Sequence, residues 1–237
     1  MLPALLLLIV FFLLPVLSLL LRSGLDPSPG LQNYAQLFGS TTYLRVFGNT
    51  FFVASVVTAV TLVIGFPTAL LLAIAPRWVS KLVFAILLLS MWTNLLARTF
   101  AWMVLLQQTG PINRLLMWLG VIHEPLTLVN NLTGVTIGMT YIMLPFLVMP
   151  LHATLRAIDP TTLRAAAICG ASRWQAFWRV LVPLAMPGIA SGALMVFVMA
   201  LGYFVTPALL GGPEYMMLAE LIAQLVQQLL NLSLIHI

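Results

Sequence analysis

The sequence predicts an all-α, polytopic membrane protein, because it is very apolar and its charges are few and grouped. Of the 237 residues, 62% are hydrophobic and only 6% are charged, whereas a soluble domain carries about 25% charged residues. Four long stretches contain no Asp, Glu, Lys or Arg: residues 1–21, 46–76, 125–155 and 180–213. A bilayer-spanning helix needs ~20 apolar residues, since the hydrocarbon core is ~30 Å thick and a helix rises ~1.5 Å per residue.

We expect five full transmembrane helices and an incomplete sixth. The full helices are predicted at Leu2–Leu21, Val46–Ala75, Leu82–Gln107, Leu132–Leu151 and Leu184–Leu210, and the sixth begins near Met216. The first is long enough to span and has no small-residue cleavage site after it, so we interpret it as a retained helix rather than a signal peptide. Prolines should interrupt the fourth and fifth spans, at Pro145, Pro150, Pro187 and Pro207.

The distribution of basic residues predicts the orientation. With the N-terminus in the cytoplasm, the cytoplasmic loops hold six basic residues and the external loops hold three. Cytoplasmic loops are normally the richer in Lys and Arg. The six are Arg77, Lys81, Arg156, Arg164, Arg173 and Arg179.

The same composition excludes other classes of protein. Cys169 is the only cysteine, so the chain can form no internal disulfide, and no metal-ligand cluster can be built on it. The net charge of +5 comes from basic residues scattered through apolar sequence, which form no stripe suited to nucleic acid. We therefore expect a lipid bilayer as the surroundings, no nucleic-acid partner, no metal and no cofactor.

The loop at 152–183 carries the clearest local signals. Asp159-Pro160 is typical of a helix start, with Asp at the N-cap and Pro at the first helical position. Small residues follow, and Gly170 should hinge this helix to a second short one. Three aromatic residues then share one helical face at spacing i, i+3, i+4: Trp174, Phe177 and Trp178. The small residues could receive a partner protein, or they could be mere helix formers beside an interfacial aromatic belt.

The spacing in this loop resembles the EAA loop of ABC-importer permeases. That pattern is Glu-Ala-Ala, three residues, Gly, nine residues, then Ile-x-Leu-Pro. Here the small pair is Ala165-Ala166, the glycine is Gly170, and Val180-x-Val182-Pro183 follows at the required distance. Arg164 stands where the pattern has glutamate. Any contact that depends on the glutamate carboxylate is therefore altered in this chain.

Further segments resemble the spermidine/putrescine branch of these permeases, although permeases for other small solutes share much of the pattern. The segments are Arg98–Trp102, Gly110–Asn113, Leu144–Phe146, Pro150-Leu151 and Gly202–Gly212.

The resemblance implies a type I importer half in a bacterial plasma (inner) membrane. Two permease subunits, the second a paralogue, would form the pathway. Two ATPase subunits would each receive one EAA loop, and a periplasmic or lipid-anchored substrate-binding protein would dock outside. The chain has no Gly-x-x-x-x-Gly-Lys-Ser/Thr phosphate loop, so we expect no enzyme activity in it and ATP hydrolysis by a separate chain.

Polar residues within the spans are candidates for the translocation pathway: Asn94, Arg98, Tyr141, Tyr203 and Glu220. Arg98 would cost about 2.5–3.5 kcal/mol at the centre of the membrane, so it either serves the pathway or snorkels to the outer interface. Asn94 lies one turn before it and could share its face. Glu220 could compensate a cationic solute or be solvated near a helix start. The tyrosines could face a cation or only pack.

Two other functions are alternatives. An intramembrane enzyme would need a nucleophile and a base, or paired carboxylates, and the spans contain neither arrangement. A structural membrane subunit would not need the small-residue segment 163–172, which suits a docking partner.

We expect residues 1–231 to form a single permease domain. The last six residues, Leu232–Ile237, resemble a translated sequencing-library adapter, so we expect the native sequence to diverge near Asn231. Met1 lacks the basic flank expected before a first span and could be a false start.

Overall fold

The computed structural model describes residues 5–7, 9–25, 30, 35 and 38–235, and these residues form helices and no strand. They divide into two compact units, residues 1–47 and 48–237. In the first unit, a π-helical segment, η1 (Ile9–Leu13), runs into α2 (Leu14–Leu25). The predicted first span is thus helical where it is described, while residues 1–4 and 8 lie outside the described part.

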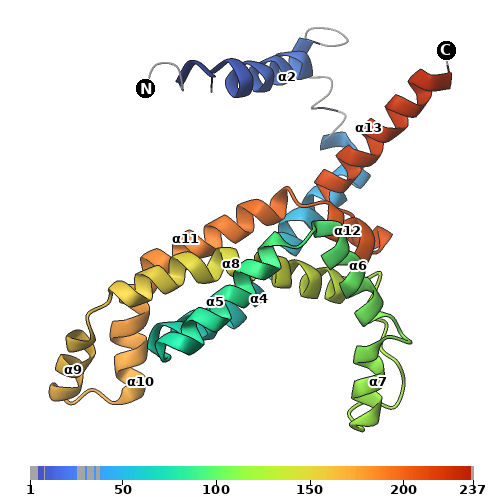
Figure 1. Cartoon of the computed structure of the whole chain (residues 1–237). Helices are drawn as coiled ribbons and strands as arrows, with labels where there is room; N and C mark the ends of the chain where they lie inside the picture. Colours follow the sequence, from blue (N-terminus) through green and yellow to red (C-terminus); the bar gives the residue numbers. More distant parts are fainter. Residues whose placement is uncertain (1–4, 8, 26–29, 31–34, 36–37, 236–237) are drawn as a thin grey trace. The chain divides into compact units, whose positions relative to one another are not determined.

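The second unit is a chain of helices in sequence order (Figure 1). The long α4 begins just before the unit boundary. The helices are α4 (Thr41–Ile74), α5 (Arg77–Trp92), α6 (Leu95–Leu106), α7 (Pro111–Trp118), α8 (Leu132–Ala157), α9 (Pro160–Ile168), α10 (Arg173–Ala176), η2 (Phe177–Leu181), α11 (Val182–Leu201), α12 (Val205–Leu210), η3 (Pro213–Tyr215) and α13 (Leu218–Ile235).

The packing of α8 against α11 forms the centre of this unit, and the two helices run alongside each other in Figure 1. Two glycines of α11 make the close approach possible. A Cβ built on Gly188 would lie 2.5 Å from Thr154 Oγ1, and one on Gly192 would lie 3.1 Å from the Leu147 carbonyl oxygen. These glycines form a Gly-x-x-x-Gly pair, and such small residues let membrane helices meet backbone to backbone.

Three described helices are long and apolar enough to cross a membrane: Thr41–Ile74, Leu132–Ala157 and the continuous Arg173–Leu201. A bent pair, Arg77–Trp92 with Leu95–Trp118, would make a fourth. The apolar stretch Leu218–Gln227, which is the first part of α13, is shorter. Many large apolar side chains lie on the surface of these helices, as expected where lipid replaces water as the solvent.

The third predicted span is wrong as a single helix. The chain bends by 104° between α5 and the α6–α7 segment. Thr93 ends α5 in an extended conformation, and the Asn94 side chain accepts hydrogen bonds from the backbone N–H groups of Leu96 and Ala97. Because an asparagine at an N-cap satisfies free N–H groups, a new helix can begin here inside apolar sequence.

The prediction that prolines interrupt the fourth and fifth spans is also wrong. Pro145 and Pro150 lie inside the continuous α8, and Pro187 lies inside α11. The fifth span instead breaks at Gly202–Phe204, between α11 and α12. Neighbouring helices and threonine side chains can compensate the backbone groups that proline leaves free.

Candidate functional site

The loop that resembles an EAA loop begins with a well-defined helix cap. Asp159 is the N-cap of α9 and Pro160 its first residue, as predicted. The Asp159 carboxylate accepts a hydrogen bond from the Thr161 backbone N–H at 2.9 Å. This bond, with a second from the Thr161 side chain, holds the pKa of Asp159 below its ordinary value. The cap is therefore charged at neutral pH and favours the helix N-terminus.

Gly170 ends α9 in a Schellman motif. The Gly170 N–H donates to the Ala167 carbonyl at 3.0 Å, and the Ala171 N–H donates to the Ala166 carbonyl at 3.1 Å. Gly170 has φ +83°, in the left-handed region that favours glycine in this motif. The predicted turn at this glycine is thus present, and its geometry explains why a glycine suits the position.

The second helix of the loop is not a separate short helix, which corrects the expectation of an independent segment ending at Pro183. α10, η2 and α11 form one continuous helix, Arg173–Leu201. Pro183 lies in the first turn of α11, directly after the π-helical turn. A π turn widens the backbone, which is one way in which proline is accommodated in a membrane helix.

A capping box starts this continuous helix. The Gln175 N–H donates to Ser172 Oγ at 3.3 Å, and the Ser172 N–H donates to Gln175 Oε1 at 2.9 Å. The sequence analysis missed this feature, although the pattern Ser-x-x-Gln was readable in the sequence. Together with the Gly170 turn, it fixes the angle at which α9 leaves the long helix.

The three loop aromatics, predicted to share one helical face, contact one another but have different environments. Phe177 is half-buried and packs edge-on against Phe66 of α4, with ring centroids 5.8 Å apart. Trp174 and Trp178 pack on each other at 5.6 Å yet stay 71% and 52% exposed. The aromatic face therefore joins the loop to the core through one ring and leaves two indoles outside.

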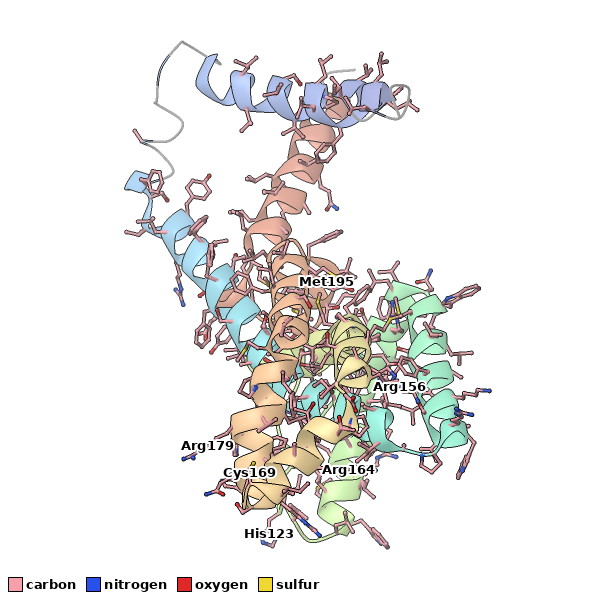
Figure 2. All side chains as sticks on the ribbon, turned by 90° about the vertical axis from the view of Figure 1, so that its left-hand side faces the viewer. His123, Arg156, Arg164, Cys169, Arg179 and Met195 are labelled. Atoms are coloured by element: carbon pink, nitrogen blue, oxygen red, sulfur yellow. The ribbon has the colours of Figure 1, made fainter. Side chains whose placement is uncertain are left out.

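Three of the six predicted coupling residues lie on α9, and Figure 2 labels Arg164 among them. Arg164 and Ala165 are exposed, Ala166 is half-buried, and the neighbouring Ile168 is 87% exposed. Val180 is half-buried and Pro183 exposed, both on the continuous helix. A cavity of about 300 Å³ lies between the two helices of the loop. Its walls are Leu163, Ala167, Ala171, Arg173, Ala176, Phe177 and Leu181.

A second cavity lies at the α5–α6 bend and brings two predicted pathway residues together. It has a volume of about 400 Å³ and is lined by Thr93, Ala97, Arg98, Ala101, Trp102, Leu105 and Tyr141. The Arg98 Nε atom is buried and has no hydrogen-bond partner. Trp102 packs edge-on against Tyr141 with ring centroids 5.4 Å apart. The sequence analysis did not single out Trp102, although it lies one helical turn after Arg98.

Tyr203 belongs to the surroundings of the same arginine. It occupies the break between α11 and α12, where its side chain interacts with Thr206 and with the charge of Arg98. Thr206 in turn lies 3.3 Å, Oγ1 to Oγ1, from the buried Thr99 of α6. Each of the two helix breaks therefore places a polar residue near Arg98. Thr93 comes from the break between α5 and α6, and Tyr203 comes from the break between α11 and α12.

The structure gives two other candidates a local role. Asn94 uses its side-chain oxygen to cap α6 and is exposed, and its role in the pathway stays a prediction. Glu220 lies in the first turn of α13 and interacts with the Met217 backbone. An acidic side chain in the first turn stabilises a helix. Within the described ranges, His, Cys, Asp and Glu do not gather in threes as a metal site would require.

The chain is similar to known membrane transport proteins. The family model "Binding-protein-dependent transport system inner membrane component" matches residues 62–235. The spermidine/putrescine transport system permease protein PotB of Escherichia coli (strain K12) is 38% identical over 192 residues, which cover 81% of this chain and 70% of PotB. Its counterpart in Haemophilus influenzae is 35% identical over 193 residues, covering 81% of this chain and 67% of that protein.

A solved structure has the same fold. A chain of a bacterial alginate ABC transporter, in complex with alginate pentasaccharide-bound periplasmic protein, superposes with a TM-score of 0.74 at 20% identity, covering 96% of this chain and 81% of that chain. This likeness supports the all-α polytopic fold, and the curated relatives are permease subunits rather than intramembrane enzymes. The chain therefore belongs to the inner-membrane components of binding-protein-dependent transport systems: it is a multi-pass permease subunit of a bacterial ABC importer, a transport component and not an enzyme.

Proposed function

We propose that this permease imports polyamines of the spermidine/putrescine class. The observation that carries the proposal is the 38% identity to PotB over 81% of the chain. The cavity at the α5–α6 bend offers aromatic surface from Trp102 and Tyr141, and ring faces attract alkylammonium groups. Arg98 then acts as a fixed positive charge that such a solute must pass, which suits a gate better than a resting site.

We propose further that α9 transmits the ATPase cycle. Its small and apolar surface, at Ala165, Ala166 and Ile168, permits close packing against a partner, and the cap and the Schellman turn hold it rigidly. Arg164 stands at the position of the glutamate in the EAA pattern, and in this proposal its side chain makes no specific contact with the ATPase. Arg164→Ala should therefore leave uptake nearly unchanged.

The full importer in this proposal contains this chain, a paralogous second permease, two ATPase subunits, and a substrate-binding protein that is periplasmic or lipid-anchored. The N-terminus lies in the cytoplasm, and residues 1–231 form one permease domain. Val180 and Pro183 belong to the helix that carries motion from α9 into the membrane.

Uptake of labelled spermidine tests the substrate proposal. A bacterial strain that lacks polyamine import should accumulate spermidine when it expresses this chain with the products of its neighbouring genes, and an ATPase should co-purify with the chain. Import of a different solute by the same complex, with none of spermidine or putrescine, would overturn the polyamine assignment and leave the permease assignment standing.

A further inference from the structure

Two tryptophans and two arginines lie together at the start of the long helix Arg173–Leu201. Trp174 and Trp178 are the exposed pair described above, and Arg173 and Arg179 are exposed beside them. In Figure 2 the Arg179 side chain projects outward from the helix. Because Phe177 is the ring that packs against Phe66, the two indoles are left on the outside of the protein.

The length of this helix places Trp178 and Arg179 at the membrane surface, with Arg173 about 9 Å further along the helix toward the water. Its 29 residues extend about 43 Å at ~1.5 Å per residue, against ~30 Å of hydrocarbon. Residues 180–213 carry no charge, and Arg179 is the last charged residue before them. The helix is therefore longer than the hydrocarbon core is thick, and it leaves the core near Arg179. This is the depth of the lipid headgroups, where tryptophan is enriched.

The arginines have no acidic counterpart nearby in sequence. Between residues 125 and 213 the only acid is Asp159, and its carboxylate caps α9 through Thr161. A guanidinium group forms paired hydrogen bonds with phosphate oxygens. A phosphate-bearing surface beside two indoles is thus the chemistry that these side chains match.

We propose that Arg173, Trp174, Trp178 and Arg179 form a binding site for the headgroup of an anionic phospholipid in the cytoplasmic leaflet. The arginines bind the phosphate, and the indoles lie at the boundary between headgroups and acyl chains. Of the four residues, Arg173 also lines the cavity between the two loop helices. The inference rests on membrane insertion and on the proposed cytoplasmic position of this loop, and it does not depend on the solute.

Fluorescence quenching tests the proposal with the full chain in vesicles. The variant keeps Trp178 and carries Phe at the other five tryptophans. We expect brominated phosphatidylglycerol to quench Trp178 more strongly than brominated phosphatidylcholine at equal mole fraction. Each basic residue near an anionic surface contributes about fivefold in affinity, so Arg173→Gln with Arg179→Gln should remove the preference for phosphatidylglycerol while quenching by both lipids persists.

A matched control is available on α5. Trp92 is 90% exposed and has no basic residue within one turn, so a protein that keeps only Trp92 should show no preference between the lipids. Equal quenching of Trp178 by both lipids in the arginine-containing protein would overturn the headgroup site. Absence of quenching by either lipid would show that protein covers the tryptophan, and would overturn it as well.

A second measurement serves if the single-tryptophan protein fails to insert. Cys169 is the only cysteine and is exposed, so one label can be placed at native Cys169, or at Trp178→Cys in a Cys169→Ser background. The label at 178 should be quenched by brominated phosphatidylglycerol, and the label at 169 only by aqueous iodide. Identical behaviour of the two labels would contradict the proposal.

Discussion

At the scale of single residues, Gly170 shows how one backbone angle can set the direction of a helix. Its φ of +83° lies in the left-handed region, yet a Cβ at this position would meet nothing within 4 Å. The requirement for glycine is therefore conformational and not steric. A residue that tolerates the left-handed region should preserve the turn, and a β-branched one should not.

We predict that Gly170→Val abolishes uptake and the stimulation of ATPase activity by the loaded binding protein, while the chain still inserts in the membrane. A left-handed conformation costs a residue with a side chain about 1–2 kcal/mol, and valine is worse because it is branched. Gly170→Asn is the control and should retain most of the activity. Equal stimulated ATPase activity in both variants and the native protein would exclude a coupling role for this turn.

Arg98 supports a second prediction at this scale, because its Nε atom is buried without a partner in a cavity. Arg98→Lys keeps the charge but loses the planar guanidinium group. We expect transport to fall by about tenfold, or ~1.4 kcal/mol, because lysine cannot reproduce the planar set of donors that arginine presents in this cavity, with assembly of the complex unchanged. Initial rates of solute uptake measure the effect.

The control for Arg98 is Arg114→Lys, at an exposed position on α7, which should leave transport unchanged. Full transport by Arg98→Ala would leave Arg98 with only an interfacial role.

Sequence reasoning identified Arg98 and Tyr141 but could not place them in one cavity, nor Tyr203 close enough to interact with the charge of Arg98, because this depends on breaks in two spans. Asn94 is instructive. A polar residue inside apolar sequence indicates a pathway position, and the structure adds a capping role that the sequence pattern did not predict. The adjacent Thr93-Asn94 pair was the available sign of a cap, but hydrophobic periodicity continues on both sides and concealed the bend.

At the scale of helices, the contact between α8 and α11 supports a prediction about stability. A Cβ at Gly188 would lie 2.5 Å from Thr154 Oγ1, 2.7 Å from Thr154 Cβ and 3.2 Å from Leu151 Cα. These last two atoms cannot move without the backbone of α8. We therefore expect Gly188→Ala to destabilise the protein by about 1–3 kcal/mol, measured as a lower midpoint of thermal unfolding in detergent.

Gly202→Ala is the matched control, since a Cβ there has nothing within 4 Å and φ is −94°. It should unfold at the native midpoint. If both variants unfold at the native temperature, α8 and α11 do not need this close approach.

Helix boundaries were predicted well where neighbouring residues in the sequence cap the helix. They were predicted poorly where contacts between helices determine whether a helix ends. The helix start at Asp159-Pro160 and the turn at Gly170 were both readable, because caps and turns act within a few residues. The continuity of α8 through two prolines was not readable, because neighbouring helices compensate the lost hydrogen bonds. Nor could apolar composition alone locate the break at Gly202–Phe204.

At the scale of the whole molecule, the single cysteine permits a direct test of orientation. A membrane-impermeant maleimide should label Cys169 in inside-out vesicles and not in intact cells, because the α9–α10 turn is predicted to face the cytoplasm. As the control, Leu119→Cys in a Cys169→Ser background should be labelled from the outside, since Leu119 is exposed on the opposite predicted side. Labelling of Cys169 in intact cells would reverse the topology.

The all-α membrane class and the permease family followed from the sequence, since composition and the spacing of one loop carry them. The packing of the spans did not follow, because lipid-facing and buried surfaces are equally apolar in such a chain. Only the structure distinguishes Val53 and Val57, which are fully buried, from Val63, which is exposed on the same helix.

Because Arg173–Leu201 is one continuous helix, a tilt at one end moves the other end. The far end lies about 42 Å from the cytoplasmic end at ~1.5 Å per residue. A tilt of about 5° imposed at the loop would displace the far end by about 4 Å over that length. The displaced end is Gly202, directly before Tyr203 and the contacts that surround Arg98. A small push at the cytoplasmic surface would thus become a change in shape on the opposite side of the membrane.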